Sequence, residues 1–203
     1  MQRPHPPFDM RESGHRFEAS PELNEWCRES FISDGGTVAN PDHAHLREAS
    51  IGFLWTNVEN VKRGRMVLGT CQLVTNSGDK WTAGRSTQQL EEWFGDLPDF
   101  LITIYAPAAA EMDNASFMAL IEHELYHAAQ KTDEHGSPMF SNMTGEPLWA
   151  MRGHDAEQFI GVVARYGAEA SMVEALVEAA NAGPTIARAR ISVACGSCLR
   201  LVG

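Results

Sequence analysis

The feature that most constrains the fold and chemistry of this 203-residue chain is the pentapeptide His123-Glu124-Leu125-Tyr126-His127. An α-helix turns about 100° per residue, so side chains four residues apart lie about 40° apart around the axis and one turn along it. Two imidazoles at this spacing can bind one tetrahedral metal ion. The H-E-x-x-H pattern therefore predicts a helix that carries two metal ligands.

The residues around the pentapeptide support a helix from Asn114 to about Lys131. Apolar residues occupy one arc of roughly 120° on this helix, and the two histidines point the opposite way. These apolar residues are Phe117, Met118, Ile121, Leu125, Ala128 and Ala129. The helix is thus expected to be anchored on one side and to offer His123 and His127 on the other. A plain polar face in contact with water is the alternative interpretation of the same pattern.

Glu124 lies about 60° from His127 on the same side of the predicted helix. From there it can hydrogen-bond a metal-bound water without ligating the metal. Zinc lowers the pKa of a bound water towards roughly 7, and a neighbouring carboxylate can take its proton as the water attacks a carbonyl. The sequence therefore predicts Glu124 as a general base.

A third ligand is expected from the segment 152–157, and His154 is the preferred candidate. It stands just before a predicted helix start, and Gly153 allows a close approach. Asp155 is better explained as the cap of that helix, with Gln158 as its capping-box partner. Glu157 is better explained as a first-turn carboxylate that the helix dipole favours. Either acid remains an alternative ligand.

The remaining histidines carry no comparable spacing signal. His135 lies in a loop sequence and could line the cleft. His43 and His45 form an H-x-H pair beside Pro41 and Asp42, which favours a surface loop. Tyr105, Tyr126 and Tyr166 are expected to pack rather than to act in catalysis.

The order of the other elements predicts an α+β fold, in which helices and strands are segregated. Ser20 and Pro21 are a capping hydroxyl and a first-turn proline, and so predict a helix start. The expected helices are 20–32, 86–94, 155–166 and 171–183, and the expected strands are 50–57, 66–75 and 99–105. Residues 1–19 are expected to be a flexible tail, residues 20–183 one domain, and residues 184–203 a separate C-terminal segment.

Composition excludes several classes of protein. A net charge of −11 disfavours binding to a phosphate backbone. No stretch reaches the roughly 18 apolar residues of a membrane span, and the N-terminus lacks the apolar core of a secretory signal. Four cysteines are too few and too scattered for a disulfide scaffold, so a reducing cytoplasm is expected. Cys195 and Cys198 form one C-x-x-C, for which reduced cysteines, half of a second metal site and a redox pair all remain open.

The chain resembles the zincin metallopeptidases, and more closely the phage- and prophage-type metallopeptidases. The resemblance covers residues 20–167, with a looser likeness to SprT-like minimal zincins. It rests on IGFLWTNV at 51–58, DFLITI at 99–104, IEHELYHA at 121–128 and RGHDAEQFIGVVARYG at 152–167.

The resemblance implies a minimal zincin-like fold: a small mixed sheet with an N-terminal helix, an HExxH active-site helix and C-terminal helices. It implies one zinc ion held by His123, His127 and His154, with Glu124 as general base. The expected activity is zinc-dependent hydrolysis of peptide bonds in a protein or peptide substrate, in the cytoplasm of a bacterial host. The substrate is expected to lie beside residues 99–105 by β-addition. The alternative is a phage structural or interaction protein that holds metal without catalysis.

Overall fold

The computed structural model describes residues 2–7, 10, 14–62, 64–75, 77–170 and 172–186. Cys195 and Cys198 lie outside the described residues, as does Ser171, the first residue of the predicted helix 171–183. The strands are β1 (Phe17–Ala19), β2 (Ile51–Thr56), β3 (Val61–Lys62), β4 (Arg65–Met66), β5 (Gly69–Leu73), β6 (Phe100–Tyr105), β7 (Ala128–Gln130) and β8 (Trp149–Met151). The helices are α1 (Pro21–Cys27), α2 (Lys80–Phe94), α3 (Ala106–Glu111), α4 (Asn114–His127), α5 (Ile160–Ala170) and α6 (Glu174–Ala182), with a π-helix over Arg28–Ile32 and a 3-10 helix over Pro41–Arg47.

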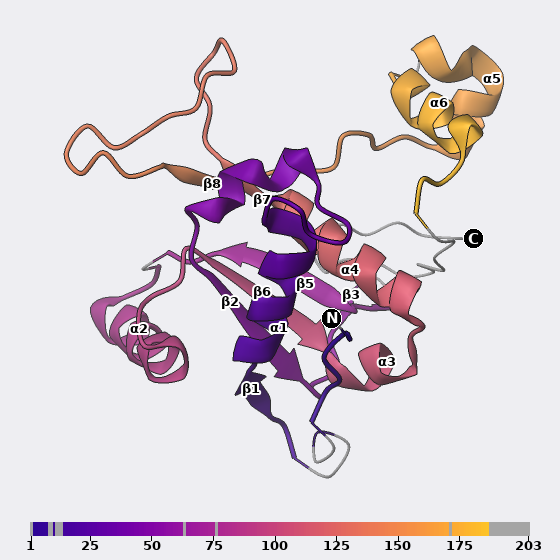
Figure 1. Cartoon of the computed structure of the whole chain (residues 1–203). Coiled ribbons are helices and arrows are strands. Elements are labelled where there is room, and N and C mark those ends of the chain that lie inside the picture. The colour runs from indigo at the N-terminus through magenta and orange to yellow at the C-terminus, as the bar shows by residue number, and fades with distance from the viewer. Residues whose placement is uncertain are drawn as a thin grey trace.

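A four-stranded mixed sheet in the order β1-β2-β6-β5 forms the centre of the fold (Figure 1). β2 and β6 are parallel, whereas β1 pairs antiparallel with β2 and β5 pairs antiparallel with β6. This arrangement confirms the predicted α+β class and agrees with a minimal zincin-like fold. β5 is an edge strand, whereas β6 already pairs on both sides. The expectation that a peptide adds beside residues 99–105 is therefore wrong.

The two faces of the sheet differ in burial, as the side chains of β6 show by alternating between them. Phe100, Ile102 and Ile104 are fully buried, whereas the residues between them are half-buried. The buried face packs against α1 and α4, where the rings of Trp55 and Phe117 stack with centroids 6.0 Å apart. The core of the fold thus lies between this face of the sheet and the two helices.

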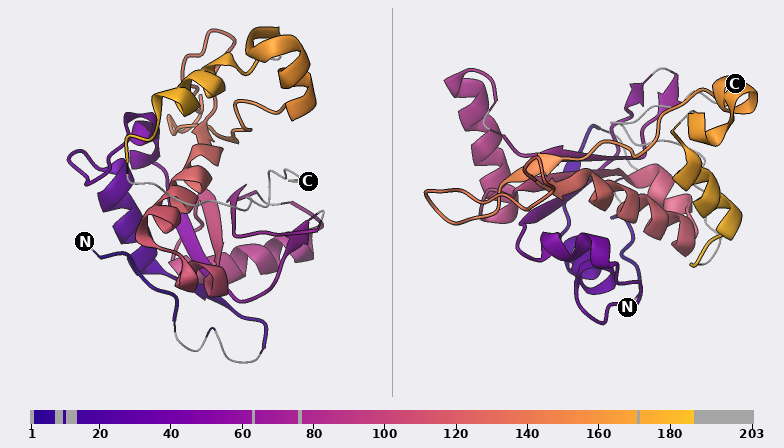
Figure 2. Two further views of the ribbon diagram at one scale, coloured as in Figure 1. Left: turned by 90° about the vertical axis from the view of Figure 1, so that its right-hand side faces the viewer. Right: turned by 90° about the horizontal axis from the view of Figure 1, so that it is seen from above.

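α2 lies on the opposite side of the sheet from α1 (Figure 2). A Cβ on Gly52 of β2 would stand 2.9 Å from the ring of Phe94, so the glycine allows the C-terminal end of α2 to touch the sheet. The sequence predicts a helix over 86–94 only. The observed helix begins earlier because the carboxylate of Asp79 accepts hydrogen bonds from the backbone N–H groups of Trp81 and Thr82.

The N-terminal residues differ from the predicted flexible tail. Phe17–Ala19 forms β1, and Met10 is buried. The Arg3 guanidinium donates to the carbonyl oxygens of Ala109 and Met112 and lies 4.7 Å from the centroid of the Phe117 ring. The polar, proline-rich composition predicts exposure, but these few anchoring side chains find partners on β2, α3 and α4.

The chain leaves α4 through a two-stranded antiparallel sheet of β7 and β8. The predicted helix to Lys131 ends at His127 instead, because Ala128 pairs with Met151. Residues 131–148 between the two strands project away from the body of the fold (Figure 1). Within the part of the chain that the structure describes, no helix has the length and apolar character to cross a bilayer.

The helix predicted over 155–166 begins later than expected. α5 begins at Ile160, so the interpretation of Asp155 as its cap is wrong. The Asp155 carboxylate instead accepts a hydrogen bond from the Arg152 guanidinium at 2.6 Å. Gly167, which follows the predicted helix 155–166, has φ of 85° and breaks the helical geometry at that point.

Candidate metal centre

The position of α4 is set by its cap and its buried face. The Asp113 carboxylate accepts a hydrogen bond from the N–H of Ser116 at 2.8 Å and so starts the helix. Four apolar side chains, Phe117, Leu120, Ile121 and Leu125, are buried against the sheet and α1. This anchoring leaves His123 half-buried on the other side of the helix, as the sequence predicts.

The structure brings the three predicted histidines together. The ligand nitrogens of His123, His127 and His154 all lie within 4.8 Å of one another. The ring centroids form a nearly equilateral triangle with sides of 5.1, 5.2 and 5.2 Å. The Nε2 atoms of His123 and His154 are 3.4 Å apart. Three converging imidazole nitrogens match the donor set that zinc prefers, so these residues fit a single metal ion.

His127 is held by the backbone of Arg152 at two points. Its Nδ1 lies 2.7 Å from the carbonyl oxygen of Arg152. Because a carbonyl only accepts, Nδ1 carries the proton, and Nε2 is left with the lone pair that a metal needs. In return, the N–H of Arg152 donates to the carbonyl oxygen of His127 at 2.9 Å. This double contact also fixes where His154 can lie, because His154 follows Arg152 by two residues.

Glu124 is fully buried between α4 and the edge strand β5. A Cβ on Gly69 would stand 2.8 Å from its Oε1, 3.1 Å from its Cγ and 3.2 Å from its Cδ. The glycine therefore leaves the space that the glutamate side chain fills. Glu124 is adjacent to His123 on the same helix, but it is not among the residues that line the cavity over the three histidines.

The histidine cluster opens to solvent on one side. His127 is buried, His123 is half-buried and His154 is exposed. A cavity of about 150 Å³ lies over them and is also lined by Tyr126 and the segment 152–155. Among the described residues, no fourth histidine, cysteine, aspartate or glutamate joins the cluster. A metal held there would keep a coordination position for a water or a substrate.

The alternative third ligands lie outside the histidine cluster. Asp155 is engaged by Arg152, and Glu157 is not a member of the group. His135 lies in an exposed turn, with its Nε2 3.6 Å from the carboxylate of Glu134. The structure thus favours His154 among the candidates that the sequence leaves open, while its role as a ligand remains a prediction.

The H-x-H pair is not the surface loop that the sequence predicts. His43 is fully buried in the 3-10 helix, and its ring meets that of Tyr126 edge-on at 4.7 Å. Burial, together with the nearby charges of His45 and Arg152, lowers the pKa of His43 to about 4, against the opposing effect of Asp42. The Nε2 of His45 contacts the carbonyl oxygen of Ala128 at 2.9 Å, just after α4 ends.

Tyr126 and Arg152 line the cavity at the histidine cluster, whereas the sequence predicts Tyr126 only as a packing residue and gives Arg152 no role. The Tyr126 hydroxyl donates to Asp42 at 3.0 Å and accepts from the amide of Asn40 at 2.8 Å. Its ring lines the cavity, and the Arg152 guanidinium lies 5.7 Å from its centroid. Burial raises the pKa of this phenol. No spacing rule identifies Arg152, whereas Tyr126 lies inside the H-E-x-x-H pentapeptide itself.

The fold and the histidine cluster together define an α+β protein with a three-histidine centre on an H-E-x-x-H helix. The chain belongs to the phage metallopeptidase family, because the family model described as "Putative phage metallopeptidase" matches residues 24–181. No curated protein and no solved structure matches the chain. The resemblance seen in the sequence is thus confirmed at the level of the family, and metal-dependent peptide hydrolysis is the activity for which the family is named.

Proposed function

We propose that this protein is a zinc-dependent peptidase in which His123, His127 and His154 hold one zinc ion. The observation that carries this proposal is a three-histidine centre with one side open to solvent and no fourth ligand among the described residues. Structural zinc sites are closed by four protein ligands, whereas catalytic sites keep a position for water or substrate. An open centre therefore supports catalysis over a purely structural role.

The chemistry divides between the metal and the side chains of this chain. A bound zinc ion would supply Lewis acidity, which polarises a carbonyl and makes a water molecule more acidic. Glu124 would accept a proton from the attacking water and return it to the leaving amine. The buried position of Glu124 against Gly69 supports this role, because it limits the side chain to few orientations. Arg152 would hold His127 in the tautomer that binds metal.

A peptide substrate would bind along β5 rather than along β6. β5 is the edge strand of the four-stranded sheet, and its first residue, Gly69, packs against Glu124. An extended peptide can add to such an edge through main-chain hydrogen bonds. The scissile carbonyl would then lie near the end of β5 that is closest to α4. The host cytoplasm as the place of action remains a prediction from the sequence.

The test compares the wild type with Glu124→Gln on a peptide library, after both proteins are loaded with zinc. The variant keeps the size and hydrogen bonding of the side chain but cannot act as a base. General-base catalysis contributes roughly 10²–10⁴-fold, so cleavage is expected to fall by that factor. Zinc content, measured by elemental analysis, is expected to stay near one ion per chain.

Two outcomes would contradict the proposal. Equal cleavage by the wild type and the variant would remove Glu124 from the mechanism. A wild type that binds zinc but cleaves no peptide in the library would instead support the non-catalytic phage protein that the sequence leaves as the alternative. Glu122→Gln is the matched control, because it makes the same substitution on the same helix at a different carboxylate. The Glu122 carboxylate accepts a hydrogen bond from the amide of Asn40.

A further inference from the structure

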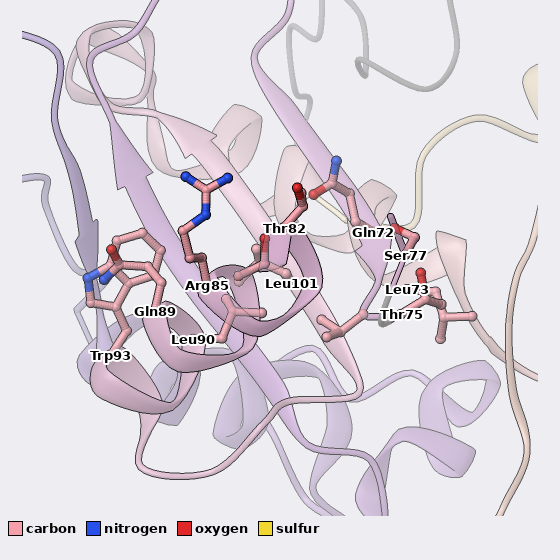
Figure 3. Close-up of a pocket in the computed structure, with 12 residues that line it drawn as sticks. Gln72, Leu73, Thr75, Ser77, Thr82, Arg85, Gln89, Leu90, Trp93 and Leu101 are labelled. Atoms are coloured by element: carbon pink, nitrogen blue, oxygen red, sulfur yellow. The ribbon is translucent and has the colours of Figure 1, made fainter. Parts of the chain in front are cut away.

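A second and larger cavity lies on the other side of the sheet from the histidine cluster. It measures about 610 Å³ and separates α2 from the ends of β5 and β6 (Figure 3). α2 spans 15 residues, yet none of them is buried. A helix in a folded domain is normally stabilised by packing of its apolar face. Along this stretch of α2, Leu90 and Trp93 border the open cavity.

Arg85 gives this cavity its chemical character. It is the one charged residue among the described residues that line the cavity, and no acid lines it. Within the described part of the chain, Arg85 forms no hydrogen bond and no ion pair. Figure 3 shows its guanidinium extending from α2 between Trp93 and Gln89 on one side and Thr82 and Gln72 on the other. A single unpaired cation in a chain with a net charge of −11 is a local site for an anion.

The rest of the lining suits a short carboxylic acid with an apolar stem. Leu90, Trp93 and Leu101 offer apolar surface, whereas Gln72 and Gln89 offer amide N–H donors. An arginine guanidinium binds a carboxylate through two parallel hydrogen bonds. Glutamate and aspartate side chains combine a carboxylate with such a stem, and both occur in polypeptides.

The position of the cavity connects it to the proposed substrate strand. Gly69 at the start of β5 packs against Glu124, and Gln72 and Leu73 near the end of β5 line the cavity. Strands rise about 3.3 Å per residue, so these two places lie about 10–13 Å apart along the edge. A peptide that adds to β5 would therefore pass the cavity three or four residues from the bond over Glu124. Alternate side chains of that peptide would point to the α2 side of the sheet.

We propose that the cavity between α2 and β5 is a specificity subsite that binds an acidic side chain of the peptide substrate. The subsite acts three or four residues from the scissile bond, and Arg85 is its specificity-determining residue. This inference rests on the proposed peptidase function and adds the substrate class to it.

The experiment measures kcat/KM for paired peptides that differ only by glutamate, glutamine or lysine at each position around the cleaved bond. Exposed ion pairs contribute roughly 0.2–1 kcal/mol, which corresponds to about a 1.4- to 5-fold preference. The wild type is expected to prefer glutamate over glutamine by such a factor at one position, and less so at high salt. Arg85→Glu is expected to reverse the preference to lysine at that position.

Lys80→Glu is the matched control, because it makes the same charge change on α2 without lining the cavity. It is expected to keep the wild-type preference. Peptides with amidated C-termini distinguish the two sources of a carboxylate. If amidation lowers cleavage and the glutamine substitution does not, the cavity binds a chain terminus and the proposal of an acidic side chain is wrong.

A binding measurement separates failure of this inference from failure of the proposed function. The Glu124→Gln protein is titrated by calorimetry with the glutamate and glutamine peptides, and the titration is repeated with Arg85→Glu added. Tighter binding of the glutamate peptide that depends on Arg85 supports the subsite even if no cleavage is seen. Cleavage with no preference for glutamate, or with a preference that Arg85→Glu leaves intact, overturns the subsite while the peptidase function stands. Binding with no such preference also overturns the subsite.

Discussion

Adding one methyl group at Gly69 is expected to displace the carboxylate of Glu124. The new Cβ would stand 2.8 Å from Oε1 and just over 3 Å from Cγ and Cδ. Favourable contacts between heavy atoms lie at about 3.5–4.0 Å, so the glutamate must retreat by roughly 0.5–1 Å. Gly69 has a backbone conformation that alanine can adopt, so Gly69→Ala perturbs this contact without straining the main chain.

The expected effect of Gly69→Ala on catalysis is larger than its effect on folding. Misplacing a catalytic group by about 1 Å can cost roughly 10²-fold in rate, so kcat is expected to fall about 10- to 100-fold. Overpacking a core costs about 1–3 kcal/mol, and the lower end is expected because only one side chain has to move. Zinc content is expected to stay at the wild-type value, because the substitution touches none of the three histidines.

The assay combines steady-state cleavage, elemental analysis of zinc and urea unfolding on the same preparations. Gly84→Ala is the control, since a Cβ on Gly84 of α2 meets nothing within 4 Å. It is expected to leave kcat unchanged and to stabilise the protein by up to about 1 kcal/mol. A wild-type kcat in Gly69→Ala would refute the role of this contact in placing Glu124. Joint loss of zinc and activity would mean that the substitution disturbs α4 itself.

Three further substitutions test other parts of the site. His154→Ala is expected to weaken zinc binding by orders of magnitude in a competition assay with a chelator, because two protein ligands remain; unchanged affinity would exclude His154 as a ligand. Asp155→Ala removes only an exposed ion pair to Arg152, so it is expected to cost less than about 1 kcal/mol of unfolding free energy and to retain zinc; release of zinc would instead make Asp155 a ligand. His43 has a pKa of about 4 in the folded protein against an ordinary value of 6.5. As the pH drops, the His43 side chain is therefore protonated in the unfolded chain before it is protonated in the folded protein. The free energy of unfolding falls as a result between about pH 6.5 and pH 4. In metal-free protein this amounts to about 2 kcal/mol between pH 7 and pH 5, and His43→Phe is expected to remove that share of the pH dependence measured by urea unfolding; an unchanged pH profile in the variant would contradict the assignment.

Local sequence signals predicted the elements that pack against the central core. The alternating apolar residues of 99–105 and the apolar run at 51–56 gave two strands at nearly their observed bounds. The H-E-x-x-H spacing placed His123 and His127 on one side of a helix, because helical geometry relates residues four apart without any knowledge of the fold. His154 was reached through its glycine-led segment and the family resemblance.

The errors arose where tertiary contacts decide the outcome. The 3-10 helix that carries His43 looks like a polar loop, yet Tyr126 covers His43 from a helix more than 80 residues away. Asp155 has the sequence pattern of a helix cap, but the charge of Arg152 competes for its carboxylate. The edge position of β5 follows from the order of strands in the sheet, which sequence periodicity does not specify. No local sequence pattern predicts the packing of Gly69 against Glu124 either.

The double hydrogen bond between His127 and Arg152 has a consequence for how the chain can vary. These two hydrogen bonds close the base of the loop 131–148. The pairing register of β7 and β8 alone therefore sets the distance between His127 and His154. Insertions or deletions beyond that base are expected to leave the metal centre intact, because loop length adds only slowly to the entropy of closure. The sequence of the loop 131–148 can therefore be exchanged, or a foreign peptide grafted into it, without changes to the neighbouring metal centre.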